Sequence, residues 1–154
     1  MARANEMIHD LQRFAATFER KDALDLPGWS SREWDALNSF AAERTLSAGE
    51  VLIKRGETER AMYFVTEGEL EVVTLYGDGQ SLGPLYRVQA GSVVGDQSFF
   101  DELPRSAKVW AVQSSRLRRL SFEEFQAYSR AYPDRALELL FALGKVLSIR
   151  LRYR

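Results

Sequence analysis

The sequence predicts a mainly β domain, an antiparallel jelly-roll β-barrel with helices at both ends. Two observations lead to this fold class. From residue 51 to residue 120 the chain is a series of short apolar runs separated by glycine-bearing turns. A turn signal roughly every 8–12 residues is typical of antiparallel sandwiches and barrels. Before and after this region, apolar residues recur at the three- and four-residue spacing of helices.

The region before the barrel is predicted to be helical. Its first apolar residues recur at helical spacing, namely Met7, Leu11, Phe14 and Phe18. Residues 4–20 are therefore expected to form an amphipathic helix. A turn at residues 25–28 follows, and Ser30 with Glu33 then has the pattern of a capping box that starts a second helix.

The β region contains seven apolar runs of strand-like composition. They are residues 51–53, 61–65, 70–75, 85–88, 93–94, 107–112 and 116–120. The segment Gly77-Asp78-Gly79 is expected to be a hairpin tip, because glycine and aspartate tolerate the positive φ angles of tight turns.

Helices are predicted again after Leu120. Ser121 with Glu124 repeats the capping-box pattern, and Pro133 stands where the first turn of a last helix accepts proline. The predicted organisation is an N-terminal helix and turn at residues 1–26 and a domain at residues 27–154, with its barrel at about 43–120 and its C-terminal helices at about 121–154.

The last predicted helix is apolar on two sides. One stripe contains Leu137, Leu140, Gly144, Leu147 and Leu151, and the other contains Leu139, Leu143, Val146 and Tyr153. One stripe can cover the barrel, but the second needs a further partner. Two partners fit this requirement: a second copy of the chain in a homodimer, or the N-terminal helix of the same chain.

The composition excludes several classes of function. The net charge of −1 gives no broad attraction to nucleic acid or to an anionic membrane. The chain has no cysteine and one histidine, His9, so we expect no metal site, no thiol or Ser-His-Asp catalysis, and no enzyme activity. The N-terminus has no apolar signal core, and no apolar run reaches the length of a membrane span. A cytoplasmic location is the expectation that fits this composition.

The segment at residues 91–107 has the parts of an anion site. Gly95 lets a ligand approach the backbone closely, and a short helix is expected to start beside it. Arg105 supplies a fork of donors that matches phosphate oxygens, and Ser106 adds a hydroxyl. Asp96 can accept hydrogen bonds from a sugar hydroxyl. The residues themselves therefore favour a ligand with a phosphate and a ribose.

Two blocks of residues resemble the cyclic nucleotide-binding domain family. The first is residues 49–68, in which glycines close successive turns around an apolar Tyr-Phe-Val strand. The second is the segment from Gly95 to Arg105, which is similar in order and spacing to the family's phosphate-binding cassette. The resemblance covers residues 27–152 and implies leading helices, an eight-stranded jelly-roll barrel and two trailing helices.

The resemblance also implies how a cyclic phosphate is held. Arg105 would pair with the phosphate. Ser106 and the backbone N–H groups around Gln97, Ser98 and Ala107 would bind the remaining phosphate oxygens.

The sugar and base have implied partners as well. Asp96 takes the place of the family's glutamate and would receive the ribose 2′-hydroxyl. The base would lie against Leu85 and Tyr86, and the last helix would close over it with Val146 and Arg150.

This chain departs from the family pattern at two places in the cassette. Aspartate is shorter than glutamate by one methylene, about 1.5 Å of reach. Unless the backbone shifts, the sugar contact is therefore expected to become water-mediated or to be lost. Gln97 and Ser98 replace a pair that is usually small and apolar, and Gln97 is expected either to face solvent or to reach the sugar itself.

The resemblance implies a cyclic nucleotide sensor, with cyclic AMP as the expected ligand and no other cofactor. The signal would pass through the C-terminal helix to an effector protein or within a dimer. No DNA-binding helix-turn-helix follows that helix, so DNA is not an expected partner. The alternative is a domain that keeps the fold, no longer binds a nucleotide, and serves as a scaffold for protein interaction or dimerisation.

Overall fold

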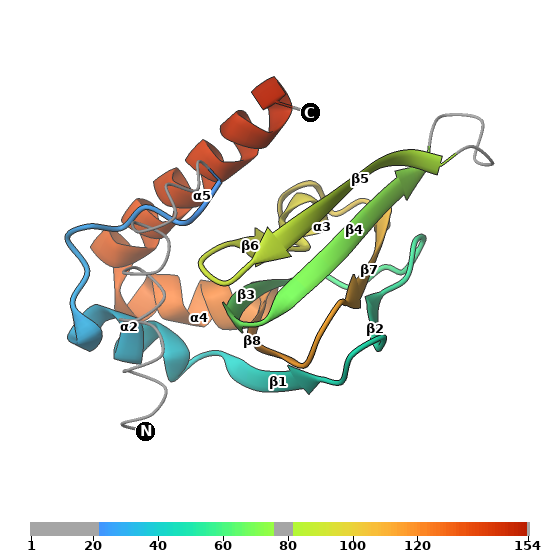
Figure 1. Cartoon of the computed structure of the whole chain (residues 1–154). Helices are drawn as coiled ribbons and strands as arrows, with labels where there is room; N and C mark the ends of the chain where they lie inside the picture. Colours follow the sequence, from blue (N-terminus) through green and yellow to red (C-terminus); the bar gives the residue numbers. More distant parts are fainter. Residues whose placement is uncertain (1–21, 76–81, 154) are drawn as a thin grey trace.

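The computed structural model describes residues 22–75 and 82–153, which form two antiparallel four-stranded sheets with helices beside them (Figure 1). The expected helix at 4–20 and the expected hairpin tip at 77–79 lie outside the described residues. The strands are β1 (Ala42–Leu46), β2 (Val51–Ile53), β3 (Ala61–Glu67), β4 (Glu69–Leu75), β5 (Leu82–Gln89), β6 (Val93–Val94), β7 (Ala107–Ala111) and β8 (Ser115–Ser121). The helices are α2 (Ser31–Asn38), α3 (Asp96–Asp101), α4 (Phe122–Ala131) and α5 (Pro133–Tyr153).

The two sheets share one apolar core. One sheet has the strand order β1–β8–β3–β6 and the other β2–β7–β4–β5. Alternate residues of both sheets point into the core between them, including Val65 and Leu117 from the first sheet and Val72, Val88 and Val109 from the second. The predicted fold class is confirmed, although the two sheets do not close into a continuous hydrogen-bonded barrel.

Strand β3 is buried on both of its faces and joins the sheets to the helices. Tyr63 and Val65 belong to the core between the sheets. Met62 and Phe64 belong to a second core, which the first sheet forms with the helices. Because side chains alternate along a strand, this double burial makes β3 a continuous apolar run.

The predicted helix starts are confirmed. Both halves of each capping box are present, from Ser30 and Glu33 at α2 and from Ser121 and Glu124 at α4, and α5 begins at Pro133. The sequence analysis missed β1, because four of its five residues are exposed and show no apolar alternation. Its pairing with β8, from Ala42 opposite Arg119 onward, defines it as a strand.

Residues 22–29 form a segment, called the strap below, that runs beside α5. Two side-chain contacts join the strap to the part of α5 that precedes its last turns. Trp29 Nε1 donates to Glu138 Oε2 at 2.7 Å. Lys145 Nζ lies 2.8 Å from Asp25 Oδ2. Leu24 and Leu26 of the strap pack into the helical core.

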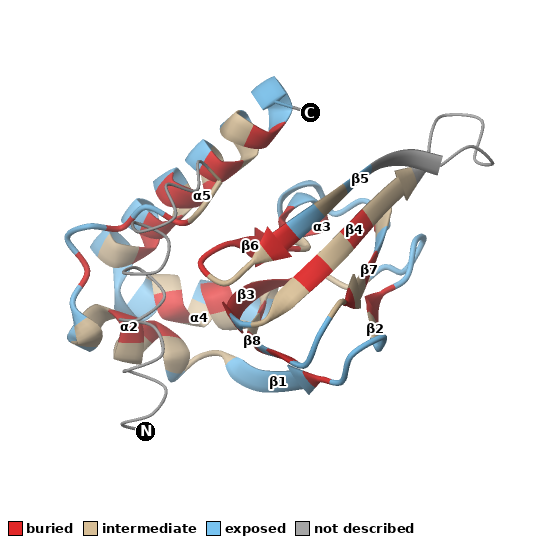
Figure 2. Ribbon diagram, viewed as in Figure 1, coloured by how far each residue is buried: buried red, intermediate tan, exposed pale blue. Residues whose placement is uncertain are grey.

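The two predicted apolar stripes of α5 are buried to different extents. Leu139, Leu143 and Val146 are fully buried in the helical core. Leu137 and Phe141 are exposed, and Figure 2 shows buried and exposed positions alternating along the helix. Among the described residues, the stripe with Leu139, Leu143 and Val146 is therefore the one that the domain covers. In the other stripe, Leu140 packs against the same core, whereas Leu137 and Leu151 are exposed. Phe141, which belongs to neither predicted stripe, adds to this exposed apolar surface. The division of the chain at residue 26 stays a prediction.

Candidate functional site

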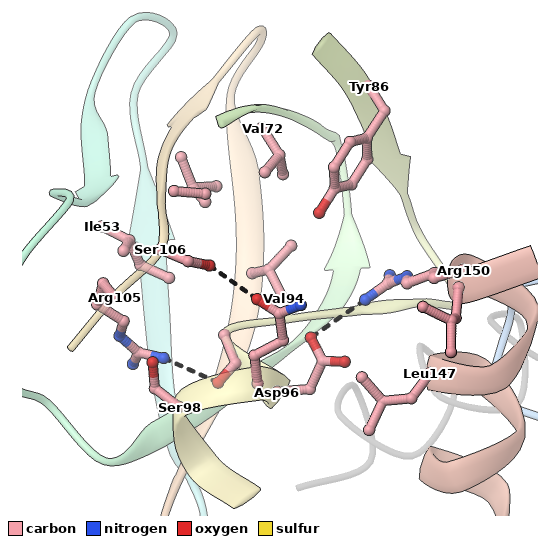
Figure 3. Close-up of a pocket in the computed structure, with 15 residues that line it drawn as sticks. Ile53, Val72, Tyr86, Val94, Asp96, Ser98, Arg105, Ser106, Leu147 and Arg150 are labelled. Atoms are coloured by element: carbon pink, nitrogen blue, oxygen red, sulfur yellow. Dashed lines mark hydrogen bonds and ion pairs between the residues drawn. The ribbon is translucent and has the colours of Figure 1, made fainter. Parts of the chain in front are cut away.

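A cavity of about 370 Å³ lies between the sheets and the last turns of α5 (Figure 3). Strands β2, β4, β5 and β7 supply its apolar wall. The turn from β6 into α3 supplies its polar groups, and α5 supplies the remaining side. The lining residues are Ile53, Val72, Tyr86, Val94, Gly95, Asp96, Gln97, Ser98, Arg105, Ser106, Ala107, Val109, Leu147, Arg150 and Leu151.

The structure brings nine of the eleven predicted site residues to this cavity. They are Tyr86, Gly95, Asp96, Gln97, Ser98, Arg105, Ser106, Ala107 and Arg150. Leu85 is 55% exposed on β5, and Val146 is fully buried in the helical core, so neither lines the cavity. On α5, Leu147 and Leu151 line the cavity, beside the position that we predicted for Val146. The binding roles of all these residues stay predictions.

Gly95 is required by the close approach of Arg105. Its φ of +78° lies in the left-handed region, and an added Cβ would stand 2.8 Å from Arg105 Nη1. The Gly95 carbonyl accepts a hydrogen bond of 2.8 Å from that same Nη1 atom. A side chain here would therefore be strained by its backbone and would displace the guanidinium.

Arg105 is buried but well supplied with partners. The residue is 4% exposed, and its Nη2 atom donates to the Ala61 carbonyl at 2.6 Å. Glu59 is its ionic partner, with 3.7 Å between Nη2 and Glu59 Oε2. Burial lowers the pKa of Arg105, but an arginine pKa starts so high that the guanidinium stays charged near neutral pH. Its Nε atom has no hydrogen-bond partner among the described residues.

Glu59 is anchored behind Arg105. Glu59 Oε1 accepts hydrogen bonds of 2.8 Å from Tyr63 Oη and from Arg119 Nε. Burial raises the pKa of Glu59, but the hydrogen bonds from Arg119 and Tyr63 outweigh burial, and the net pKa is lowered. Glu59 is therefore a carboxylate at neutral pH and a fixed negative charge beside the arginine.

Asp96 is paired with a residue from the far end of the chain. Its Oδ1 atom accepts a hydrogen bond of 3.1 Å from Arg150 Nη1 on α5, and both residues are buried (Figure 3). Arg150 Nη2 also donates to Ser92 Oγ at 2.9 Å and to the Val93 carbonyl at 2.7 Å. Arg150 Nε lies 3.5 Å from Asp22 Oδ2 of the strap. The second oxygen of Asp96, Oδ2, is buried with no hydrogen-bond partner among the described residues.

Ser106 and Gln97 are bonded to each other at the mouth of the cavity. Ser106 Oγ donates to Gln97 Oε1 at 2.7 Å, and both side chains are exposed. Gln97 was expected either to face solvent or to reach the sugar. In the structure its side chain is exposed and bonded to Ser106, which is predicted to bind the phosphate. Asp96, the predicted sugar acceptor, is bonded to Arg150 instead.

Sequence reasoning missed two residues that shape this site. Glu59 lies in a polar turn, Glu57-Thr58-Glu59, where nothing distinguishes one carboxylate from the other. Asp22 lies far from the cassette in sequence and reaches the site only because the strap runs beside α5. No sequence signal pointed to either residue, since both contacts depend on tertiary packing.

A sequence model of the cyclic nucleotide-binding domain matches residues 43–132, more than half of the chain. The chain belongs to the cyclic nucleotide-binding domain family. The predicted resemblance is thereby confirmed. The assignment also agrees with the expectation that the chain is not an enzyme, because the family is defined by a ligand-binding regulatory domain.

Known proteins similar to this cyclic nucleotide-binding domain agree with the assignment. A cyclic AMP receptor protein of Thermus thermophilus is 29% identical over 125 residues, 78% of this chain and 55% of the relative. The crystal structure of the Thermus thermophilus catabolite activator protein superposes with a TM-score of 0.71 at 28% identity, covering 82% of this chain and 57% of that one. A cyclic nucleotide-binding domain from Methylobacillus flagellatus has a TM-score of 0.76 at 23% identity, covering 84% and 72%, and supports the fold alone. The chain spans between 23% and 55% of the length of the curated relatives that it matches.

Residues 22–75 and 82–153 contain no cluster of three or more histidine, cysteine, aspartate or glutamate side chains able to hold a metal ion. Within the same ranges, no helix is both long enough and apolar enough to span a bilayer.

The geometry of Gly95 predicts the result of a glycine substitution. Gly95→Ala should destabilise the domain by about 1–2 kcal/mol, the cost of holding a non-glycine residue in the left-handed region, with a further loss as Arg105 moves. Gly144→Ala is the matched control, because the added methyl meets open space in helix α5, and this change should stabilise by about 0.4–1 kcal/mol. Urea unfolding of both variants measures the difference. Equal stability of the two variants would contradict the role of Gly95.

Proposed function

We propose that this domain binds cyclic AMP in the cavity beside α5. One observation carries the proposal: a single cavity is lined by Arg105, by Ser106 and by Asp96, which still has a buried oxygen without a partner among the described residues. Arginine and serine suit a cyclic phosphate, and the unpaired Asp96 oxygen suits the ribose 2′-hydroxyl. A buried unpaired acceptor costs free energy, so a ligand hydroxyl that satisfies it contributes to binding.

The apolar side of the cavity suits a purine base. Ile53, Val72 and Val109 form this wall, and Figure 3 shows Tyr86 pointing toward it from β5. Apolar walls with a few placed polar groups, in a volume of about 300–1,000 Å³, are typical of small-molecule sites. Adenine is the base that we propose, and the similarity to a cyclic AMP receptor protein supports this choice.

Titration calorimetry with cyclic AMP and cyclic GMP tests this function. The wild-type chain should bind cyclic AMP more tightly than cyclic GMP. Arg105→Lys keeps the charge but loses the forked donor geometry, so it should weaken binding about 10- to 150-fold, the worth of a charge-assisted hydrogen bond. Arg130→Lys, at an exposed position of α4, is the control and should leave the affinity unchanged. Absence of binding by folded wild-type protein would contradict the proposal and leave the scaffold alternative.

We further propose that the ligand acts by favouring a docked position of α5. Arg150 already ties the last turns of α5 to Asp96 and to the Val93 carbonyl. Leu147 and Leu151 of the same turns line the open side of the cavity. A base held against these leucines would add contacts that exist only when α5 is docked, and such differential contacts shift the population toward that state.

Hydrogen exchange in residues 144–153 tests the coupling. Arg150→Met should speed exchange in these turns, because the helix loses its polar ties to the cassette, and cyclic AMP should slow exchange again. Arg152→Met, at an exposed position of the same helix end, should behave like the wild type. If exchange in these turns is unchanged by both Arg150→Met and cyclic AMP, the last helix does not take part in signalling.

A second candidate function, a dimerisation scaffold, is favoured by the exposed apolar residues Leu137 and Phe141 of α5. Phe141 is 73% exposed, and a groove of about 620 Å³ lined by Leu137, Phe141 and Trp29 runs along this face. Large exposed apolar patches commonly mark interaction sites. A second copy of the helix in a homodimer is the partner that we propose for this groove.

Light scattering tests the dimer. The wild-type chain should have twice the monomer mass, and Phe141→Asp should be a monomer because the charge would be buried in an apolar interface. Gln126→Asp, at an exposed position of α4, should remain a dimer. A monomeric wild type would remove the homodimer and leave another protein as the partner of the groove.

A further inference from the structure

One side-chain hydrogen bond joins Ser106 and Gln97 at the part of the cavity where we propose that the phosphate binds. Ser106, just before strand β7, donates from Oγ to Gln97 Oε1 of α3 at 2.7 Å. Both residues line the cavity, and a dashed line in Figure 3 marks the hydrogen bond of Ser106. The contact joins the two ends of the segment that carries the polar groups of the site.

The hydroxyl of Ser106 has one proton to donate. It can donate that proton to Gln97 Oε1 or to an oxygen of a bound phosphate, but not fully to both. A cyclic phosphate offers acceptors only, so it cannot replace Ser106 as a donor to the carboxamide oxygen of Gln97. Binding through Ser106 therefore requires the existing hydrogen bond to break.

The other polar groups of the site do not face this competition in the same way. Asp96 keeps Oδ2 without a partner while Oδ1 is bonded to Arg150. Arg105 keeps Nε without a hydrogen bond while Nη1 and Nη2 are bonded to carbonyls. Ser106 differs because its single proton is already committed to Gln97.

We propose that Gln97 is an affinity-setting residue, which competes with the ligand phosphate for the hydroxyl of Ser106. The inference rests on the proposed function, since it concerns the same cavity. Gln97 is exposed, so its contact with Ser106 is worth about as much as a typical net hydrogen bond. Removing the competitor should then tighten binding about two- to tenfold. The residue thereby sets the ligand concentration at which the domain responds.

A double-mutant cycle on the full chain tests this inference. Gln97→Met keeps the length of the side chain and removes the carboxamide, and Ser106→Ala removes the hydroxyl. With cyclic AMP in titration calorimetry, Gln97→Met should bind about two- to tenfold more tightly than wild type. In the Ser106→Ala background the same change should have no effect, because nothing remains to compete for. Gln126→Met on α4 is the control for the glutamine-to-methionine change.

The outcomes separate this inference from the proposed function. Tighter binding by Gln97→Met that disappears in the Ser106→Ala background supports competition. Weaker binding by Gln97→Met would overturn it, because the carboxamide would then be a ligand contact. The inference would also be overturned if Gln97→Met tightened cyclic AMP binding equally in the wild-type and Ser106→Ala backgrounds. If wild type binds and Gln97→Met is unchanged, only the role of Gln97 fails. If no folded variant binds cyclic AMP or cyclic GMP, the proposed function fails and the inference fails with it.

Discussion

The buried guanidinium of Arg105 is the interaction on which the site depends. A charge at 4% exposure is tolerated only with partners, and Arg105 has three. These are the Ala61 carbonyl at the start of β3, the Gly95 carbonyl before α3, and Glu59. Its backbone completes the connection, with a 2.8 Å bond from Arg105 N to the Glu57 carbonyl. The floor of the cavity is therefore built around one side chain, and the conformation of Gly95 follows from it.

Contacts within the chain also engage the polar side chains that line the cavity. Three of these side chains each have a partner from the chain: Glu59 for Arg105, Arg150 for Asp96, and Gln97 for Ser106. A ligand gains only the difference between its own contacts and those that it replaces. A complete set of residues suited to phosphate therefore does not by itself specify tight binding. Affinity depends on the competitors as much as on the residues that touch the ligand.

The sequence predicted those features that depend on local patterns. The capping boxes at Ser30 and Ser121 and the grouping of Gly95 with Arg105 follow from fixed short spacings, and the structure has them. The pairing of Asp96 with Arg150 could not be predicted, since it joins residues 54 positions apart. Predicting this pair requires knowing how α5 packs against the rest of the domain. Strand β1 was missed for a related reason, because its pairing with β8 defines it while its own residues are mostly exposed.

The position of α5 and the state of the cavity are linked by Arg150. This one side chain contacts Asp96 of the cassette, the Val93 carbonyl of β6 and Asp22 of the strap. If a ligand binds more tightly when α5 is docked, then α5 docks more firmly by the same factor when the ligand is bound. A partner that draws α5 away must therefore lower ligand affinity, and a partner that holds it in place must raise it. The strap is also part of this linkage, because Asp22 of the strap and Asp96 both contact the guanidinium of Arg150. A substitution of Asp22 is thus expected to alter the proposed ligand site, because Asp22 and Asp96 both contact the positive charge of Arg150.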